Sequence, residues 1–355
     1  MKRIYLILFS VSFLFSCNED KKNEVADIPL TVKTLTDTTT YCKDPIFNSA
    51  FKEMKAMLEG KTKPDFKRSA FLAEWAYDTT LNYSVFSNQI SKIAFELKAF
   101  IKERGVEKYK TSGNFALFEF FTKPHKMNNF SPYAYDFDDF YGKKDYRNVS
   151  VSKLLKTHKG QCQSMPFLYK ILSDEIGAES YLALAPAHCY IKHLDEQGKW
   201  VNIELTNGHF SSDAWMISSM EISAESIKKG VYMKELNPKE SIALCLMDLA
   251  IAHARKNGGY NQFSILCANE VLKYYPNNVS AVMGKYCAIR DESFAYMKKH
   301  GKQKCPYLLE NIEKLKVIDK ELESLGFSEM SPESYAEWQE SMAKEKIKLA
   351  KQNQL

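Results

Sequence analysis

Three side chains in the middle of the sequence have the types and the order that thiol-dependent catalysis requires. Cys162 begins an apolar helical stripe, and His188 and Glu204 follow it within two segments of strand character. A thiolate can attack an acyl carbon, an imidazole can carry the proton, and a carboxylate can orient the imidazole. The sequence therefore suggests nucleophilic catalysis by Cys162, with His188 as the base and Glu204 as the orienting acid.

A helix over residues 162–176 is expected to position the thiol. Its apolar residues recur at three- and four-residue steps, and Gly177 follows at the position of a C-cap. Gly160 permits a tight turn before the helix. In the first helical turn, free backbone N–H groups and the helix dipole favour a thiolate. We expect the N–H groups of Cys162 and Gln163 to be available to an oxyanion, and we take Gln161 and Gln163 as oxyanion or orienting candidates.

Two strands, at residues 180–192 and 199–206, are expected to form a hairpin that carries the other two side chains. Register decides whether they meet, because a slip of one residue moves a side chain to the opposite face. A loop of three or five residues around Gln197 would place His188 opposite or diagonal to Glu204. Asn202 shares the alternating face of Glu204 and is the alternative orienting group.

These segments resemble the transglutaminase-like superfamily, whose core is a papain-like cysteine fold. The matching stretches are KGQCQSMPFLYKILSDEIG, APAHCYIKH and WVNIELTNG, and the lead-in at residues 148–155 is similar as well. The resemblance implies that Cys162 is the nucleophile and His188 the base. It also implies that Glu204 stands where the family usually has aspartate.

The N-terminus looks like an export signal. Lys2 and Arg3 precede an apolar stretch at residues 4–15 that is too short to span a bilayer. The sequence Leu14-Phe15-Ser16-Cys17 resembles the lipobox of bacterial lipoproteins, which implies acylation at Cys17 and removal of residues 1–16. An ordinary secretory signal is the alternative. We expect a lipid-anchored protein of the cell envelope, with the outer membrane favoured and the leaflet open, and no transmembrane helix.

The rest of the chain divides into four expected segments. A polar, Thr-rich tether at residues 18–43 precedes a helical and mixed N-terminal lobe at 44–148 and the transglutaminase-like core at 149–235. Residues 236–355 resemble a tetratricopeptide repeat, with helices at 241–256, 262–275 and 279–299 and a last helix at 331–338. Because one repeat is not stable alone, we expect this tail to pack on the preceding domain. The expected fold class is therefore α+β.

Composition excludes several kinds of function. The 355 residues carry 49 Lys and Arg against 44 Asp and Glu, a formal charge of +5 without basic runs, so we expect no nucleic-acid partner. Residues 135–141 are acidic and aromatic, but they lack EF-hand spacing, so we interpret them as a solvated loop. We expect no metal and no cofactor. The cysteines other than Cys17 and Cys162 are interpreted as small core residues without a disulfide framework.

The functional hypothesis is a membrane-anchored cysteine hydrolase or acyl-transferase that acts on amide or peptide bonds through Cys162, His188 and Glu204. Its partners would be a peptide or protein substrate and, through acylated Cys17, the membrane. The alternative is a catalytically silent, surface-tethered binding or scaffold lipoprotein. It would keep the same fold and use the helical repeat for contacts with a protein partner.

Overall fold

A computed structural model describes residues 42–301 and 305–327, together with residues 340 and 344. Over these residues the fold is α+β, with many helices, a four-stranded antiparallel sheet and a two-stranded parallel sheet. The expected signal peptide, Cys17, all but the end of the tether and the last expected helix at 331–338 lie outside the described residues. No helix within the described ranges is long and apolar enough to cross a bilayer.

The N-terminal lobe is helical, as the sequence predicts. Its first three helices begin at Asp44, Asp65 and Asn82, whose side chains accept backbone N–H groups of the first turn. The third ends just before Gly105, which has a positive φ. The helices of the lobe are α1 (Pro45–Leu58), α2 (Phe66–Tyr77), α3 (Tyr83–Glu103) and α4 (Ser112–Thr122).

A strap of short elements links α4 to the candidate nucleophile. Its two strands pair in parallel, with Ala134 opposite Lys159 and Tyr135 opposite Gly160, so the start of the strap lies beside the residues just before Cys162. The elements are η1 (Lys126–Asn128), β1 (Ala134–Tyr135), η2 (Tyr146–Val149), α5 (Val151–Thr157) and β2 (Lys159–Gly160).

Helix α6 (Ser164–Ile176) ends at Gly177 in a left-handed conformation, as its sequence predicts. The four-stranded sheet follows in simple order, β3 (Tyr181–Ala185), β4 (His188–Leu194), β5 (Trp200–Glu204) and β6 (His209–Ser211). The prediction of one strand over 180–192 is wrong, because the chain reverses at Pro186 and Ala187 and forms two strands. Proline has no N–H for a ladder and fixes a φ that suits a turn.

The C-terminal segment is helical and breaks where Gly258 and the Pro276-Asn277-Asn278 sequence predict breaks. Each helix from α9 on packs against the next one in the chain. Helix α12 was not predicted. The helices after the sheet are α7 (Asp213–Ser219), α8 (Ala224–Lys228), α9 (Pro238–Asn257), α10 (Gln262–Tyr274), α11 (Val279–His300) and α12 (Pro306–Ser324).

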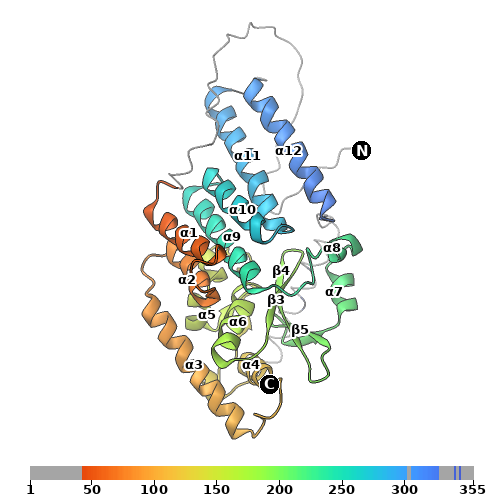
Figure 1. Cartoon of the computed structure of the whole chain (residues 1–355). Helices are drawn as coiled ribbons and strands as arrows, with labels where there is room; N and C mark the ends of the chain where they lie inside the picture. Colours follow the sequence, from red (N-terminus) through yellow and green to blue (C-terminus); the bar gives the residue numbers. More distant parts are fainter. Residues whose placement is uncertain (1–41, 302–304, 328–339, 341–343, 345–355) are drawn as a thin grey trace.

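Helix α9 is the centre of the packing. It is apolar on most of its circumference, and it packs against α1 and α2 of the N-terminal lobe as well as against α10. One cluster of buried residues joins these helices to α6 and to one face of the sheet. A second cluster joins the sheet to α7, α11 and α12. The tail thus packs on the N-terminal helices α1 and α2 and, through the second cluster, on the sheet of the expected core. Figure 1 shows α11 and α12 extending from one end of the molecule.

Candidate active site

Cys162 lies in the turn that leads into α6, and not in the first helical turn as expected. Helix α6 starts at Ser164, because local hydrogen bonds satisfy the backbone before it. The Gln161 N–H donates to Ser164 Oγ at 3.1 Å, and the Gln163 N–H donates to the side-chain oxygen of Gln161 at 2.6 Å. The Cys162 thiol is half-buried, so it remains accessible.

The same hydrogen bonds reduce the number of backbone N–H groups that are available to an oxyanion. The Gln163 N–H is occupied by the Gln161 side chain, so it is not available to a substrate in this conformation. The Cys162 N–H is the backbone candidate that remains. Gln161 is buried, and its amide oxygen shapes the turn.

Gly160 is required for space and not for an unusual φ. It is not among the glycines with positive φ. A Cβ atom at this position would lie 2.6 Å from Ser164 Oγ and 2.8 Å from Leu154 Cδ1, closer than real Cβ contacts allow. The glycine therefore lets β2 lie directly beside the start of α6. This close packing sets the position of the turn that contains Cys162.

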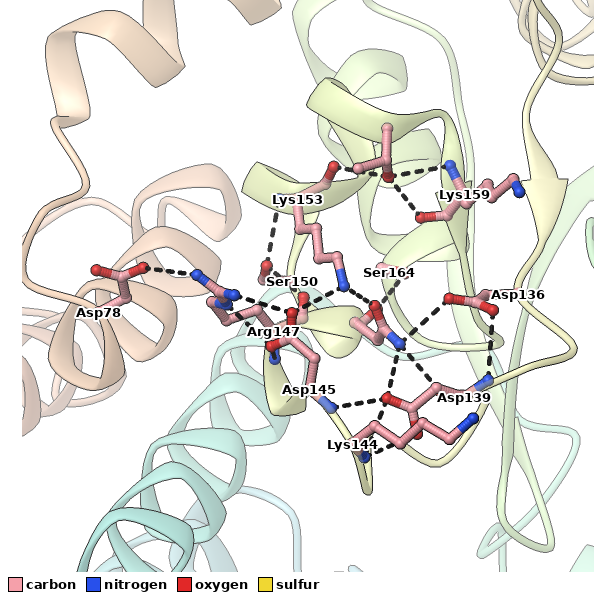
Figure 2. A network of polar contacts seen from close by, with 12 residues as sticks. Asp78, Asp136, Asp139, Lys144, Asp145, Arg147, Ser150, Lys153, Lys159 and Ser164 are labelled. Carbon is pink, nitrogen blue, oxygen red and sulfur yellow. Dashed lines mark hydrogen bonds and ion pairs between the residues drawn. The ribbon is translucent and has the colours of Figure 1, made fainter.

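A network of polar contacts holds the strap against this turn (Figure 2). The Asn148 side-chain amide donates to Asp136 Oδ2 at 3.2 Å and to Asp139 Oδ2 at 3.0 Å, and Lys153 Nζ donates to the Asn148 side-chain oxygen. Ser164 Oγ donates to the Asn148 carbonyl at 3.2 Å. The Asp139 carboxylate also accepts backbone N–H groups of residues 143–145.

The acidic loop is partly exposed, as expected of a solvated loop, and it also gives structural support to the nucleophile turn. The carboxylates of Asp136 and Asp139 accept N–H groups of the Asn148 side chain and of the backbone at residues 138–139 and 143–145. Within the described part of the chain, no group of three or more His, Cys, Asp or Glu side chains is arranged to hold a metal ion.

The turn between β3 and β4 brings His188 to Cys162. Ala185 pairs with His188, so Pro186 and Ala187 form a two-residue turn. Ala187 has a φ of 51°, a left-handed conformation that costs an L-residue about 1–2 kcal/mol. Cys162 Sγ lies 3.8 Å from the Ala187 carbonyl oxygen, at donor distance for a thiol. Strain of this kind is concentrated at functional sites.

The register of the sheet places Glu204 diagonally across from His188. Strands β4 and β5 pair Leu194 with Trp200 and Ile191 with Ile203 around an odd-numbered loop, as required for the two side chains to share a face. His188 Nε2 lies 2.5 Å from Glu204 Oε2. The other carboxylate oxygen accepts the Thr206 N–H at 3.1 Å and the Thr206 hydroxyl at 2.8 Å. Glu204 is only 3% exposed, and both of its oxygens are hydrogen-bonded.

The electrostatics favour an ion pair between these side chains. Burial lowers the pKa of His188, but the charge of Glu204 and contacts with both Cys162 and Glu204 outweigh it and raise the pKa to about 10. Burial raises the pKa of Glu204, and the charge of His188 with its hydrogen bond outweighs this and lowers it. The imidazolium–carboxylate state therefore predominates at neutral pH. Since Nε2 is bound to Glu204, Nδ1 is the ring nitrogen left for the thiol.

Asn202 does not take part in this arrangement. Its amide donates to the Ser211 carbonyl at 3.1 Å and to Asp213 Oδ1 at 2.7 Å, which ties β5 to β6 and to the start of α7. The structure thus brings Cys162, His188 and Glu204 together and leaves Asn202 apart.

Tyr135 is a residue of this site that the sequence analysis missed. Its side chain is buried on β1, and burial raises its pKa, with further increases from the charges of Cys162 and Glu204. Its hydroxyl therefore stays protonated at neutral pH and remains a hydrogen-bond donor. The aromatic cluster at residues 135–141 gave no signal that would separate Tyr135 from its neighbours.

Two further acids, Glu74 of α2 and Asp248 of α9, lie behind the nucleophile turn. They line a hollow of about 200 Å³, and Asp248 also lines a larger cavity that contains Cys162 and His188. Burial raises the pKa of both acids to about 7. The Gln163 side chain is hydrogen-bonded to Asp248. A lone acid inside the apolar sequence IALCLMDLAIA was a usable signal for Asp248.

The arrangement is that of an α+β protein with a half-buried thiol beside an imidazolium–carboxylate pair. Comparison of the chain with protein-family models, with curated proteins and with solved structures finds no match.

Proposed function

We propose that the protein is a cysteine hydrolase or acyl-transferase of the transglutaminase-like type, acting on amide or peptide bonds. The observation that carries the proposal is the contact of 2.5 Å between half-buried His188 and buried Glu204, with Cys162 beside the imidazole. A thiolate next to an imidazolium is the reactive form of a catalytic cysteine. The turn that leads into α6 and the paired strands β4 and β5 meet to build it.

The residues can divide the reaction as follows. The Cys162 thiolate attacks the carbonyl carbon of the amide, and an S–C bond forms as the carbonyl oxygen becomes an oxyanion. His188 gives its proton to the departing amine as the C–N bond breaks, which leaves an acyl-enzyme. His188 then takes a proton from water or from an acceptor amine, which attacks the thioester and releases Cys162. Glu204 stays ionised throughout and holds the imidazole in orientation.

Hydrolysis is the favoured fate of the acyl-enzyme in the second half of the reaction. An exported enzyme meets water as its abundant acceptor, whereas crosslinking needs an amine positioned at the acyl-enzyme. The substrate on this proposal is a peptide or protein.

The test is alkylation of Cys162 by iodoacetamide in the mature chain between pH 4 and 9, followed by mass spectrometry. We expect rapid labelling at pH 6 that falls about 10²-fold in His188→Ala, because the imidazolium that stabilises the thiolate is lost. Cys162→Ser identifies the labelled site. Labelling that follows an ordinary thiol near pH 8.5, unchanged in His188→Ala, would overturn the proposal and favour the silent scaffold.

We also propose that the protein is anchored to the envelope, with the outer membrane favoured, by acylation at Cys17. The support is the sequence of residues 1–17. In cells fed an alkyne fatty acid, we expect the full-length chain to carry the label and to enter the detergent phase on phase separation. Cys17→Ser is expected to lose both properties. An unlabelled wild-type chain of mature length would instead indicate an ordinary secretory signal.

A further inference from the structure

Cys162 and His188, called the catalytic pair below, line a cavity whose opposite wall is formed by helices of the C-terminal tail. The cavity has a volume of about 680 Å³, and it is lined by Cys162 and His188 on one side and by residues of α9 and α11 on the other. This volume is within the range of sites that bind small molecules or peptide side chains. The tail therefore completes the candidate site.

The wall that faces the catalytic pair is mainly apolar. Helix α9 contributes Leu244, Met247 and Ile251, and α11 contributes Val279 and Met283. Helix α11 approaches α9 so closely that a Cβ atom at Gly284 would lie 2.9 Å from Met247 Cε. Methionine side chains adapt to apolar groups of varied shape.

Several charged groups of this cavity are already engaged by the protein. Arg290 and Asp291 form an ion pair at 2.8 Å, and Asp291 also accepts the Tyr260 N–H at 2.9 Å. The Gln163 amide is hydrogen-bonded to Asp248, and the Arg255 guanidinium lies over the Tyr146 ring. The main interaction that the cavity offers to an incoming group is therefore apolar contact.

We propose that the substrate carries a bulky apolar side chain next to the amide that Cys162 attacks, and that this side chain binds between α9 and α11. The inference rests on the proposed function and deepens it. Binding energy from this side chain would hold the carbonyl at the thiol, as remote contacts do in enzymes generally.

The probes are two chloroacetamides with the same electrophile and different tails, N-phenethyl and N-(2-hydroxyethyl), with chloroacetamide as the reference. In each case the Cys162 S–C bond forms and chloride leaves. With the full mature chain, we expect the phenethyl reagent to alkylate Cys162 about 10-fold faster or more than the hydroxyethyl reagent, and to show saturation, because a phenyl ring is buried on binding.

Ser280→Trp tests the location of the preference, because Ser280 is exposed at the start of α11 and lines the cavity. We expect the preference to fall below about 3-fold when each rate is divided by that for chloroacetamide. Ala295→Trp, at an exposed position of the same helix outside the cavity lining, is the matched control and should keep the wild-type preference.

Equal rates for the two reagents in the wild type, or a preference that persists in Ser280→Trp, would overturn the inference. Results that reject the apolar subsite can be distinguished from results that reject the proposed cysteine-dependent function. If Cys162 is an ordinary thiol, all labelling is slow and indifferent to His188→Ala, yet the ratio of the two reagents is still measured. A His188-dependent thiol without the preference would keep the function and reject the apolar subsite.

Discussion

Glu204→Gln is expected to lower the rate of Cys162 alkylation at pH 7.5 by about 10²-fold while the chain remains folded. The amide oxygen of glutamine can still accept the Nε2–H of His188, so the hydrogen bond is retained and only the charge is removed. Without that charge, burial is opposed mainly by the contact with Cys162, and the pKa of His188 falls from its value of about 10. A larger fraction of the imidazole is then neutral at pH 7.5, and the thiolate loses its counter-ion.

The same change has a defined effect on stability. Because the folded pKa of His188 is raised, its contribution is fully present below pH 6.5 and is lost as the pH rises towards 10. Because the folded pKa of Glu204 is lowered, its contribution is present above pH 4.5 and is lost as the pH falls. Urea unfolding should therefore show the largest loss of stability in Glu204→Gln between about pH 5 and 6.5 and a smaller loss near pH 10.

Glu196→Gln is the matched control for this experiment. Glu196 lies on the exposed loop between β4 and β5, where it accepts hydrogen bonds from Thr111. It changes the net charge equally and leaves His188 untouched, so the labelling rate should stay at the wild-type value. Equal labelling rates in Glu204→Gln and Glu196→Gln would show that the carboxylate does not support the thiolate.

Asp248→Asn is expected to stabilise the protein at pH 8 by about 2–4 kcal/mol and to have little effect at pH 4. Burial and the nearby charge of Glu74 raise the pKa of Asp248 from 3.8 to about 7, and burial raises that of Glu74 from 4.5 to about 7. Between the ordinary pKa of each acid and its raised pKa of about 7, the folded chain binds more protons than the unfolded chain. The free energy of unfolding therefore falls as the pH rises through this window, and asparagine removes the contribution of one acid.

The charged groups around the same hollow do not cancel this effect. Lys153 and Arg147 are paired with Asp145, and burial holds the pKa of Tyr146 well above its usual range, so it stays neutral. Lys156 lines the hollow from an exposed position of α5.

Urea unfolding at pH 4 and pH 8 measures the difference, with Glu313→Gln on the exposed face of α12 as the control. Comparing variant and wild type at the same pH removes the contribution of the His188–Glu204 pair. The same difference between pH 4 and pH 8 in both variants would contradict the raised pKa of Asp248.

Local signals in the sequence predicted the elements that carry the candidate site. The apolar stripe and Gly177 define α6, and the spacing around Gln197 allowed the register that brings Glu204 towards His188. The predictions of element boundaries were wrong where a local side-chain contact or a distant element decides the structure. The hydrogen bonds of Gln161 delay the start of α6, and Pro186 divides one apparent strand into two.

The surroundings of the site could not be predicted from local patterns. The packing of α9 on α2 brings Asp248 and Glu74 to one hollow, although the two residues are far apart in the sequence. Tyr135 comes near the nucleophile turn because β1 pairs with β2, which places Tyr135 opposite Gly160. Side-chain contacts of this kind depend on tertiary packing, which periodicity along the chain does not report.

The position of α9 also determines when the N-terminal helices can pack during synthesis of the chain. Synthesis delivers α1 and α2 first, yet their apolar faces are covered by a helix that begins only at Pro238. Until that helix emerges, the earlier two-thirds of the chain exposes the surface that it will bury, and such exposed surface binds chaperones or aggregates. The cavity beside Cys162 is therefore complete only after α9 and α11 have been synthesised.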